Sequence, residues 1–154
     1  MFSTRGPGRA NTFSGTDCMA KNILITGGAG FIGRWAVKAF LQETKDSVFV
    51  LDDFSNGMRE NIAEFKNEPR LKEVKKGGIQ QEKMLRNMFD RVKPDVCVHL
   101  AAQINVQDSI DNPRHTFDAD VRGTFGLLEA CRGAGASMVF MSTCMVYDLA
   151  GAGG

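Results

Sequence analysis

The sequence has little net charge, no long apolar run and few residues of the kinds that bind metals. Its 19 basic and 18 acidic side chains leave a formal net charge of +1, so nothing points to nucleic acid or an acidic membrane surface as a partner. No apolar stretch approaches the roughly 18 residues that a membrane-crossing helix needs. Only two histidines are present, and no two of the four cysteines have CxxC spacing, which argues against a zinc site. We therefore expect no metal, no nucleic acid and no membrane.

The first twenty residues differ in composition from the rest of the chain. Residues 1–20 are rich in Gly, Ser, Thr and Arg and lack hydrophobic periodicity, as is typical of a disordered tail. They contain no apolar segment of the secretory type, although they weakly resemble an organelle transit peptide. Cys97 and Cys131 lie in apolar patterns and are expected to be buried free thiols, which fits a reducing compartment. We expect a cytoplasmic protein with one domain over residues 21–154.

From Lys21 onward, strand-like apolar runs alternate with segments of helical spacing. The expected strands cover residues 22–26, 47–52, 71–75, 95–100 and 137–142. The expected helices cover residues 31–44, 59–65, 81–92 and 114–133. This alternation predicts an α/β fold, a Rossmann-type doubly wound parallel sheet with strand order 3-2-1-4-5. Ligands of such sheets bind outside the carboxyl ends of the strands, here at the switch point between the first and fourth strands.

Two of the expected helices have a predicted inner face. In the first helix, six side chains are expected on one side: Phe31, Ile32, Trp35, Ala36, Ala39 and Phe40. In the helix over residues 81–92, four side chains are expected to point inward: Met84, Leu85, Met88 and Phe89.

The segment TGGAGFIG, residues 26–33, follows the first strand and opens the first helix. Gly27 lets the chain turn sharply, Gly30 lets backbone approach a pyrophosphate, and Gly33 lets the helix pack close to the sheet. The free N–H groups and the positive end of the helix dipole then hold phosphates. A lone GxGxxG is weak evidence, but the strand before it and the helix after it strongly predict a dinucleotide site. The alternative is a glycine-rich turn without a ligand.

Two acidic residues, Asp52 and Asp53, end the second strand about 25 residues after Gly27. A carboxylate at this place accepts hydrogen bonds from the ribose hydroxyls of the adenosine half and repels a 2′-phosphate, which favours NAD over NADP. Asp52, at the strand end, is the preferred ribose ligand. The alternative for Asp53 is a solvated loop acid.

With these motifs identified, the chain resembles the extended short-chain dehydrogenase/reductases, in particular the NAD-dependent nucleotide-sugar epimerases and dehydratases of the UDP-glucose 4-epimerase type. The resemblance rests on five segments in the expected order, which span most of residues 21–148: GGAGFIG, LDDFSNG, HLAAQ, DVRGTFGLLEAC and MSTCMVYD. No single segment is decisive. Their order and spacing carry the resemblance.

The resemblance implies a cofactor, a reaction and a set of site residues. It implies NAD, and transient oxidation of the C4 hydroxyl of a UDP- or dTDP-hexose followed by return of the hydride. The implied cofactor contacts are Gly27, Gly30, Phe31, Ile32, Gly33, Asp52, Asp53, Asn56, Leu100, Ala101, Ala102 and Gln103. Thr143 takes the place of the family's catalytic Ser/Thr, or is a strand-end threonine bonded to backbone. A homodimer through helices that include residues 114–133 is expected weakly.

Four departures from the family pattern affect these expectations. The family's YxxxK pair should follow the fifth strand by roughly 25 residues and is not in this sequence, while Tyr147 belongs to a different segment. We therefore expect a domain truncated before its last strands and substrate lobe, inactive by itself.

Gly78 stands where the family often has an acid that contacts adenine, which predicts looser adenine binding. Asp120 stands where the family usually has Asn, and its alternative is a helix-surface acid.

The fourth departure is Thr143-Cys144-Met145, where 4,6-dehydratases carry Thr-Asp-Glu. Methionine cannot exchange protons, so standard 4,6-dehydration is disfavoured. Cys144 is a candidate proton donor or base in an atypical dehydratase, or else a small filler at a strand end. The rival to an enzyme is a non-catalytic NAD-binding module or a truncated inactive product.

Overall fold

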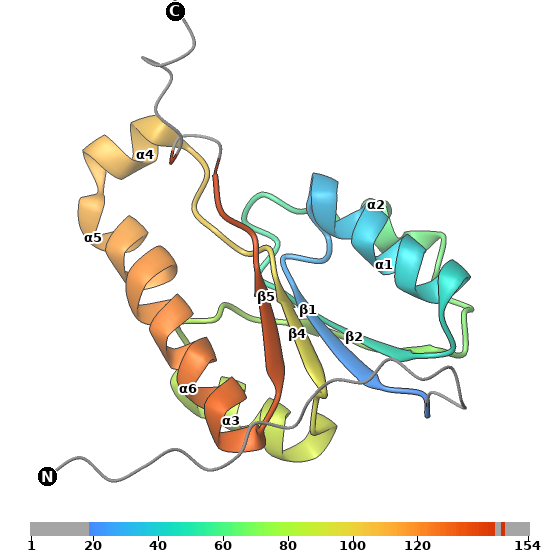
Figure 1. Ribbon diagram of the computed structural model, residues 1–154. Coiled ribbons are helices and arrows are strands. Elements are labelled where there is room, and N and C mark those ends of the chain that lie inside the picture. The colour runs from blue at the N-terminus through green and yellow to red at the C-terminus, as the bar shows by residue number, and fades with distance from the viewer. Residues whose placement is uncertain (1–18, 144–145, 147–154) are drawn as a thin grey trace, which may run out of the picture.

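The structure is a computed structural model that describes residues 19–143 and 146, and it contains a five-stranded parallel sheet with helices on both faces (Figure 1). The strands are β1 (Asn22–Thr26), β2 (Ser47–Asp52), β3 (Leu71–Lys76), β4 (Val96–His99) and β5 (Ser137–Phe140). Their spatial order is β3-β2-β1-β4-β5, and every pair is parallel. The predicted fold class and strand order are confirmed. The predicted tail lies outside the described residues except for its last two.

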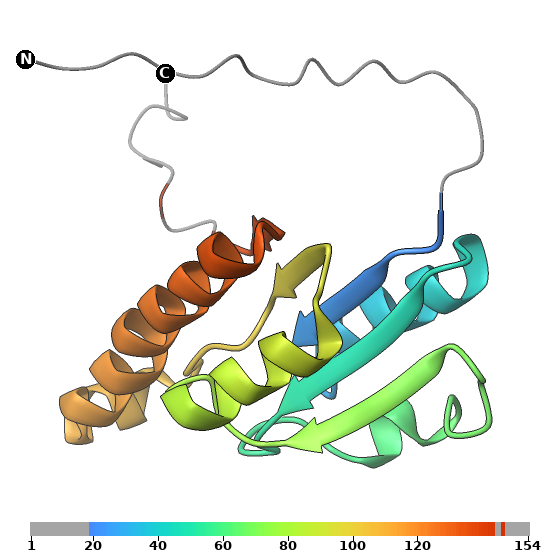
Figure 2. The ribbon, with the colours of Figure 1, turned by 90° about the horizontal axis from the view of Figure 1, so that it is seen from below.

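The helices form a layer on each side of the sheet. Helices α1 (Phe31–Glu43) and α2 (Glu60–Ala63) lie on one face, and α3 (Glu82–Val92) and α6 (Thr124–Ala134) lie on the other. In Figure 2 the sheet is seen between α1 on one side and α3 and α6 on the other. Three short elements connect β4 to α6: α4 (Val106–Asp111), α5 (Pro113–Thr116) and the π-helix η1 (Phe117–Gly123).

The central strand β1 shows no polar alternation because both of its faces are covered. Ile23 and Ile25 belong to the core beneath α1, whereas Leu24 belongs to the core beneath α3 and α6. Burial of a large aliphatic side chain stabilises the fold by about 1.5–3 kcal/mol. The strand therefore holds its carboxyl end, Thr26, firmly in the middle of the sheet.

The predicted inner face of α1 is wrong in its phase. The buried residues of this helix are Gly33, Val37 and Leu41. Of the six predicted side chains, Ala36 and Phe40 do pack against the core, but the other four are exposed: Phe31, Ile32, Trp35 and Ala39. The phase is set by Gly33, which has to face the sheet because α1 packs directly on the preceding turn. The prediction for α3 is confirmed, since Leu85, Met88 and Phe89 are buried and Met84 packs against the same core.

The helix expected over residues 114–133 is not one α-helix. Its first part is α5 and the π-helix η1, and only the second part is α6. Wide π-turns add a residue to the turn and are frequent at functional sites. Here η1 carries Asp120 to the loop after β4 while Gly123 packs on Ile79. Helix α4 was not expected, although its start carries a recognisable cap, because the Asn105 side chain accepts hydrogen bonds from the N–H groups of Gln107 and Asp108.

Other boundaries shift by a few residues at element ends. The expected helix over residues 59–65 is reduced to α2, β4 is shorter at both ends, and β5 ends at Phe140 rather than at residue 142.

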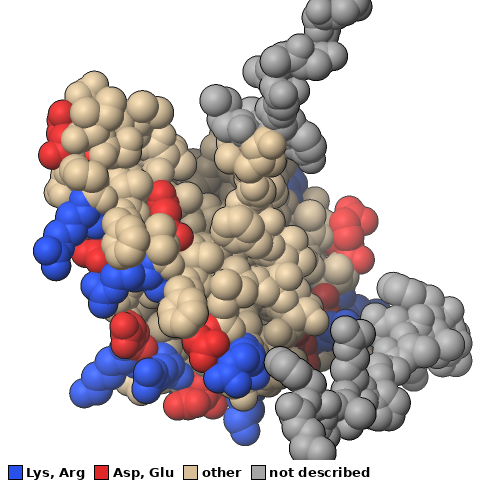
Figure 3. Space-filling model, turned by 60° about the vertical axis from the view of Figure 1, so that its left-hand side comes forward, with Lys and Arg blue, Asp and Glu red and all other residues tan. Residues whose placement is uncertain are grey.

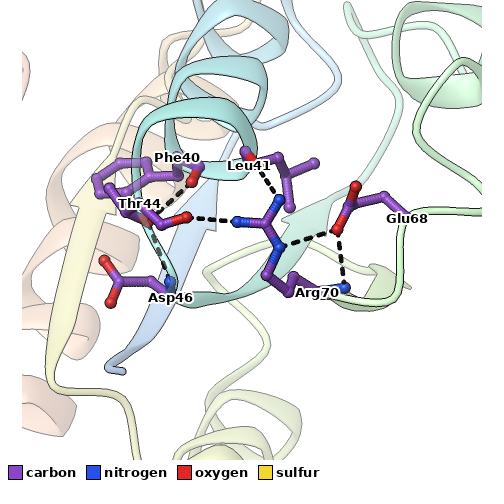
Figure 4. Close-up of polar contacts among 6 residues, drawn as sticks. All are labelled: Phe40, Leu41, Thr44, Asp46, Glu68 and Arg70. Carbon is purple, nitrogen blue, oxygen red and sulfur yellow. Dashed lines mark hydrogen bonds and ion pairs between the residues drawn. The ribbon is translucent and has the colours of Figure 1, made fainter. Parts of the chain in front are cut away.

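The carboxyl end of α1 is anchored by Arg70, which precedes β3 (Figure 4). The guanidinium donates to the carbonyl groups of Leu41 and Thr44, and its Nε donates to Glu68 Oε1 over 2.9 Å. These carbonyls are among the acceptors that a helix end leaves unpaired, and a cation there also complements the helix dipole. Arg70 thereby fixes the direction of α1, whose other end lies at the carboxyl edge of the sheet.

The two edge strands differ in character. β3 carries Lys72, Lys75 and Lys76, and charged side chains of this kind discourage edge-to-edge pairing. β5 instead leaves Val139 and Phe140 54% and 57% exposed. In the view of Figure 3, the charged side chains gather mainly at the lower left, and a broad uncharged surface lies beside them.

Candidate functional site

The turn after β1 admits only glycine at two places. Gly27 has a positive φ of 71°, and a Cβ there would lie 2.7 Å from the backbone nitrogen of Ala101. At Gly33, a Cβ would lie 2.0 Å from the carbonyl oxygen of Gly27. A side chain is therefore excluded at both positions by backbone atoms that cannot move aside. The sharp turn predicted at Gly27 and the close packing predicted at Gly33 are both present.

Gly30 differs from these two residues because it is much less crowded by the fold. A Cβ at Gly30 would meet a single neighbouring atom, the Gly27 carbonyl oxygen, at 3.3 Å. Gly30 is also the N-cap of α1, makes no side-chain cap, and is followed by no acidic residue in the first turn. The first N–H groups of a helix lack intrahelical acceptors. This end of α1 is therefore an open set of donors with the chemistry of an anion site.

Asp52 lies next to this turn and is 5% exposed. Its Oδ2 accepts the N–H of Ala29 and its Oδ1 accepts the N–H of Phe54, each over 2.8 Å. A carboxylate has about four acceptor sites, so each oxygen keeps one for a further donor. Asp53 is exposed and uses Oδ1 to accept the N–H and the hydroxyl of Ser55. Asp52 is thus built into the turn, whereas Asp53 shapes a surface loop.

The loop after β4 is held by a buried histidine that the sequence analysis did not single out. His99 is 2% exposed, with Nδ1 2.7 Å from Thr26 Oγ1 and Nε2 3.0 Å from Thr124 Oγ1. Burial lowers the pKa of His99 to about 4, although the nearby Asp120 carboxylate acts in the opposite direction. The imidazole is therefore neutral near pH 7 and ties β1, β4 and α6 together.

Asp120 also takes part in positioning this loop. It is half-buried, and its Oδ1 accepts the N–H of Gln103 over 2.7 Å. The alternative of a helix-surface acid is therefore wrong. The Gln103 side chain in turn accepts from Asn56 Nδ2 over 3.4 Å, which joins the loops that follow β4 and β2.

All twelve predicted cofactor contacts line one cleft of about 280 Å³ at the carboxyl edge of the sheet. They are Gly27, Gly30, Phe31, Ile32, Gly33, Asp52, Asp53, Asn56, Leu100, Ala101, Ala102 and Gln103. Gly78, which the family pattern placed beside adenine, also lines the cleft, but its neighbours in the run 77–80 and the pair His115 and Ala119 were not predicted. Residues 77–80 follow β3, so the shared edge of a parallel sheet could have indicated them. His115 and Ala119 gave no such signal because their place depends on α5 and the π-helix.

The predicted catalytic residues lie beyond β5. Met141 lines the cleft, and its N–H donates to the carbonyl of His99 over 3.1 Å. Thr143 is exposed two residues further on. Cys144 lies outside the described residues. The catalytic roles of Thr143 and Cys144 stay predictions.

Within the described part of the chain, no group of three or more His, Cys, Asp or Glu side chains could hold a metal ion. None of the described helices is both long enough and apolar enough to span a membrane.

The sheet order, the glycine turn and the acid beside it define a Rossmann-type domain. The chain belongs to the GDP-mannose 4,6 dehydratase family, whose model matches residues 24–151. A dTDP-glucose 4,6-dehydratase of Neisseria gonorrhoeae is 38% identical over 113 residues, which cover 73% of this chain and 32% of that protein. The chain thus spans about a third of the length of this curated relative.

The solved structures that are similar to the chain include one from Bacillus thuringiensis and one from Thermus thermophilus. That of Pal from Bacillus thuringiensis is 53% identical, with a TM-score of 0.79 over 82% of this chain and 40% of the other. That of UDP-glucose 4-epimerase from Thermus thermophilus, a complex with NAD, is 35% identical, with a TM-score of 0.70 over 79% of this chain and 37% of the other.

Proposed function

We propose that this chain binds NAD in the cleft and is the cofactor-binding part of an enzyme that epimerises or dehydrates a UDP- or dTDP-hexose. The observation that carries the proposal is the cleft, which brings the glycine turn, the open end of α1 and Asp52 together. Membership of a dehydratase family and the similarity to an epimerase solved with NAD support it.

The residues of the cleft fit the cofactor. The uncrowded side of Gly30 and the N–H groups at the start of α1 would hold the diphosphate. Asp52 would accept the ribose hydroxyls with the acceptor sites that the turn leaves open. Ala101 and Ala102 would lie along the nicotinamide half. NAD, when bound, supplies a reversible hydride acceptor for the C4 position of the sugar.

Residues 143 and 144 carry the proposed substrate chemistry. The Thr143 hydroxyl would donate to the sugar oxygen and lower the cost of moving its proton. Transient C4 oxidation leading to epimerisation is the first form of the proposal. In the second form, Cys144 acts as the proton donor or base of an atypical dehydratase.

NAD binding is tested with a matched pair of glycine substitutions. Gly30→Val places a side chain in the cleft with one tight backbone contact, 3.3 Å to the Gly27 carbonyl oxygen, so it should weaken NAD binding at least about tenfold, as expected for loss of diphosphate contacts. Gly126→Val makes the same change on α6, where nothing lies within 4 Å of the added carbon, and should leave binding unchanged. Calorimetric titration with NAD measures the dissociation constants of the wild type and both variants. No NAD binding by the folded wild type would refute the proposal.

The rival is a non-catalytic NAD-binding module. The two are separated by incubating the full-length natural protein with UDP-glucose or dTDP-glucose and identifying the products. An epimer supports the first form, and a 4-keto-6-deoxy sugar that is lost in Cys144→Ala supports the second. Binding of NAD with no turnover of either sugar favours the rival.

A homodimer through the groove between α3 and α6 is part of the proposal. This groove measures about 1080 Å³ and contains Phe125, which is 65% exposed. It is lined by three acidic and three basic side chains: Glu82, Asp90, Glu129, Arg86, Lys93 and Arg122. A second copy related by a two-fold axis could pair these opposite charges. Sedimentation of the wild type and of Phe125→Asp should show a dimer and a monomer, respectively.

We also propose that the protein works in the cytoplasm. Cys97 and Cys131 are buried free thiols joined by a hydrogen bond. That hydrogen bond and burial raise the pKa of Cys97, which keeps this thiol protonated. Two neighbouring thiols without a disulfide fit a reducing compartment. Fluorescent tagging of the natural protein tests this location.

A further inference from the structure

The segment that follows β3 forms one end of the cleft, beside Asp52. The N–H of Gly77 donates to the backbone carbonyl of Asp52 over 2.9 Å, which fixes this segment to the end of β2. Gly77, Gly78 and Ile79 are buried, and all of them line the cleft. If Asp52 holds the adenosine ribose, the base attached to that ribose lies at this end of the cleft.

Gln80 occupies the space that a side chain at position 78 would take. A Cβ on Gly78 would lie 2.3 Å from Oε1 and 2.6 Å from Nε2 of Gln80. The Gln80 carboxamide is therefore folded back over the Cα of Gly78, and this exposed residue lines the cleft. Glycine at position 78 is what makes this conformation possible, because any larger residue would displace the amide.

The carboxamide keeps its hydrogen-bonding capacity for a ligand. The backbone carbonyl of Gln80 accepts the N–H of Glu82. The Gln80 side chain makes no hydrogen bond within the part of the chain that the structure describes. A carboxamide presents one acceptor and one donor group side by side. Adenine presents the matching pair, an amino group beside a ring nitrogen, and Gln and Asn recognise adenine in this bidentate way.

The geometry points to Gln80 as the residue that recognises the adenine base, with its carbonyl accepting from the amino group and its amide N–H donating to the adjacent ring nitrogen. This inference rests on the proposed NAD function and names a residue of the same site. It replaces the expectation that adenine is bound loosely because residue 78 has no side chain. A carboxylate at this place could only accept, whereas the carboxamide satisfies both groups of the base.

The test compares Gln80→Ala with Gln81→Ala by calorimetric titration with NAD. Gln81 is the neighbouring exposed glutamine, makes no side-chain cap for α3, and lines a different pocket between β3 and α3. Loss of the paired hydrogen bonds should raise the NAD dissociation constant of Gln80→Ala about tenfold, with no change in Gln81→Ala. Gln80→Glu keeps an acceptor for the amino group but loses the donor, so its affinity should fall between those of wild type and Gln80→Ala.

A second ligand checks that the lost contact is with the base. In 1,N6-etheno-NAD the adenine amino group carries no hydrogen, so the wild type should bind it more weakly than NAD, and Gln80→Ala should bind the two with more nearly equal affinity. The inference is overturned if Gln80→Ala binds NAD within twofold of the wild type, or if Gln81→Ala loses as much. Failure of the wild type itself to bind NAD would overturn the proposed function instead. Circular dichroism confirms that each variant is folded.

Discussion

The hydroxyl of Thr26 lies 2.7 Å from Nδ1 of His99, at the carboxyl ends of two neighbouring strands. Thr26 Oγ1 also accepts the N–H of Ala101 over 3.4 Å. The other ring nitrogen, Nε2, lies 3.0 Å from Thr124 Oγ1. Through this one imidazole, the loop that forms a wall of the cleft is tied both to the centre of the sheet and to α6.

Stability should fall with acidification because of His99. Its folded pKa of about 4 lies below the ordinary value of 6.5, so the unfolded chain takes up a proton at a higher pH than the folded chain. The contribution of neutral His99 to the free energy of unfolding is complete above pH 6.5. It is lost as the pH falls toward 4, by on the order of 3 kcal/mol in total. Urea unfolding at several pH values, for the wild type and for His99→Gln, measures the difference. A gap between the two proteins that stays constant with pH would contradict the assignment of this titration to His99.

Two helical glycines, Gly33 in α1 and Gly126 in α6, should respond very differently to substitution by alanine. Gly33→Ala drives a methyl group against the Gly27 carbonyl and should lower the free energy of unfolding by about 3 kcal/mol or more. Gly126→Ala adds a methyl group in an open helical position and should stabilise by about 0.5–1 kcal/mol. Thermal unfolding of both variants provides the measurement. Similar melting temperatures for the two would show that α1 does not pack on the turn as described.

Substitution by asparagine should have a much larger effect on stability and NAD binding at Asp52 than at Asp53. Asp52→Asn replaces one of two buried acceptors by a donor, so it should destabilise the fold by about 1–3 kcal/mol and weaken NAD binding. Asp53→Asn changes an exposed turn and should alter stability by less than about 0.5 kcal/mol. Denaturant unfolding and NAD titration of both variants test this. Equal losses in both would remove the reason for preferring Asp52.

Removal of the Arg70 guanidinium should loosen α1. Arg70→Ala leaves the carbonyls of Leu41 and Thr44 without their donor (Figure 4), so it should lower the free energy of unfolding by about 1–3 kcal/mol. Arg114→Ala is the control, because Arg114 is 89% exposed at its side chain and reaches Asp118 only at 4.0 Å. Hydrogen exchange should also quicken in the last turn of α1 for Arg70→Ala. An unchanged exchange pattern would show that the helix end is held by other contacts.

The sequence by itself determined the sheet and the position of the cleft. The apolar run of β1, the spacing of Gly27, Gly30 and Gly33, and the acid at the end of β2 are local signals, because each depends only on periodicity or on the absence of a side chain. Parallel connectivity then dictates where the strand ends meet. For this reason Gly27, Gly30, Gly33 and Asp52, which these signals predicted, line one cleft together with the contacts that the family resemblance added.

Only the tertiary structure decided the phase of α1, the π-helix and the residues that hold the cleft together. Gly33 overrides the apolar pattern of α1 because a Cβ at this position would lie 2.0 Å from the Gly27 carbonyl oxygen, so only glycine can face the turn. The bond from Gln103 to Asp120 and the position of Gln80 over Gly78 join residues that are not neighbours in any repeating pattern. Periodicity reports which side chains prefer burial, whereas the atoms that they meet are fixed only when distant segments pack together.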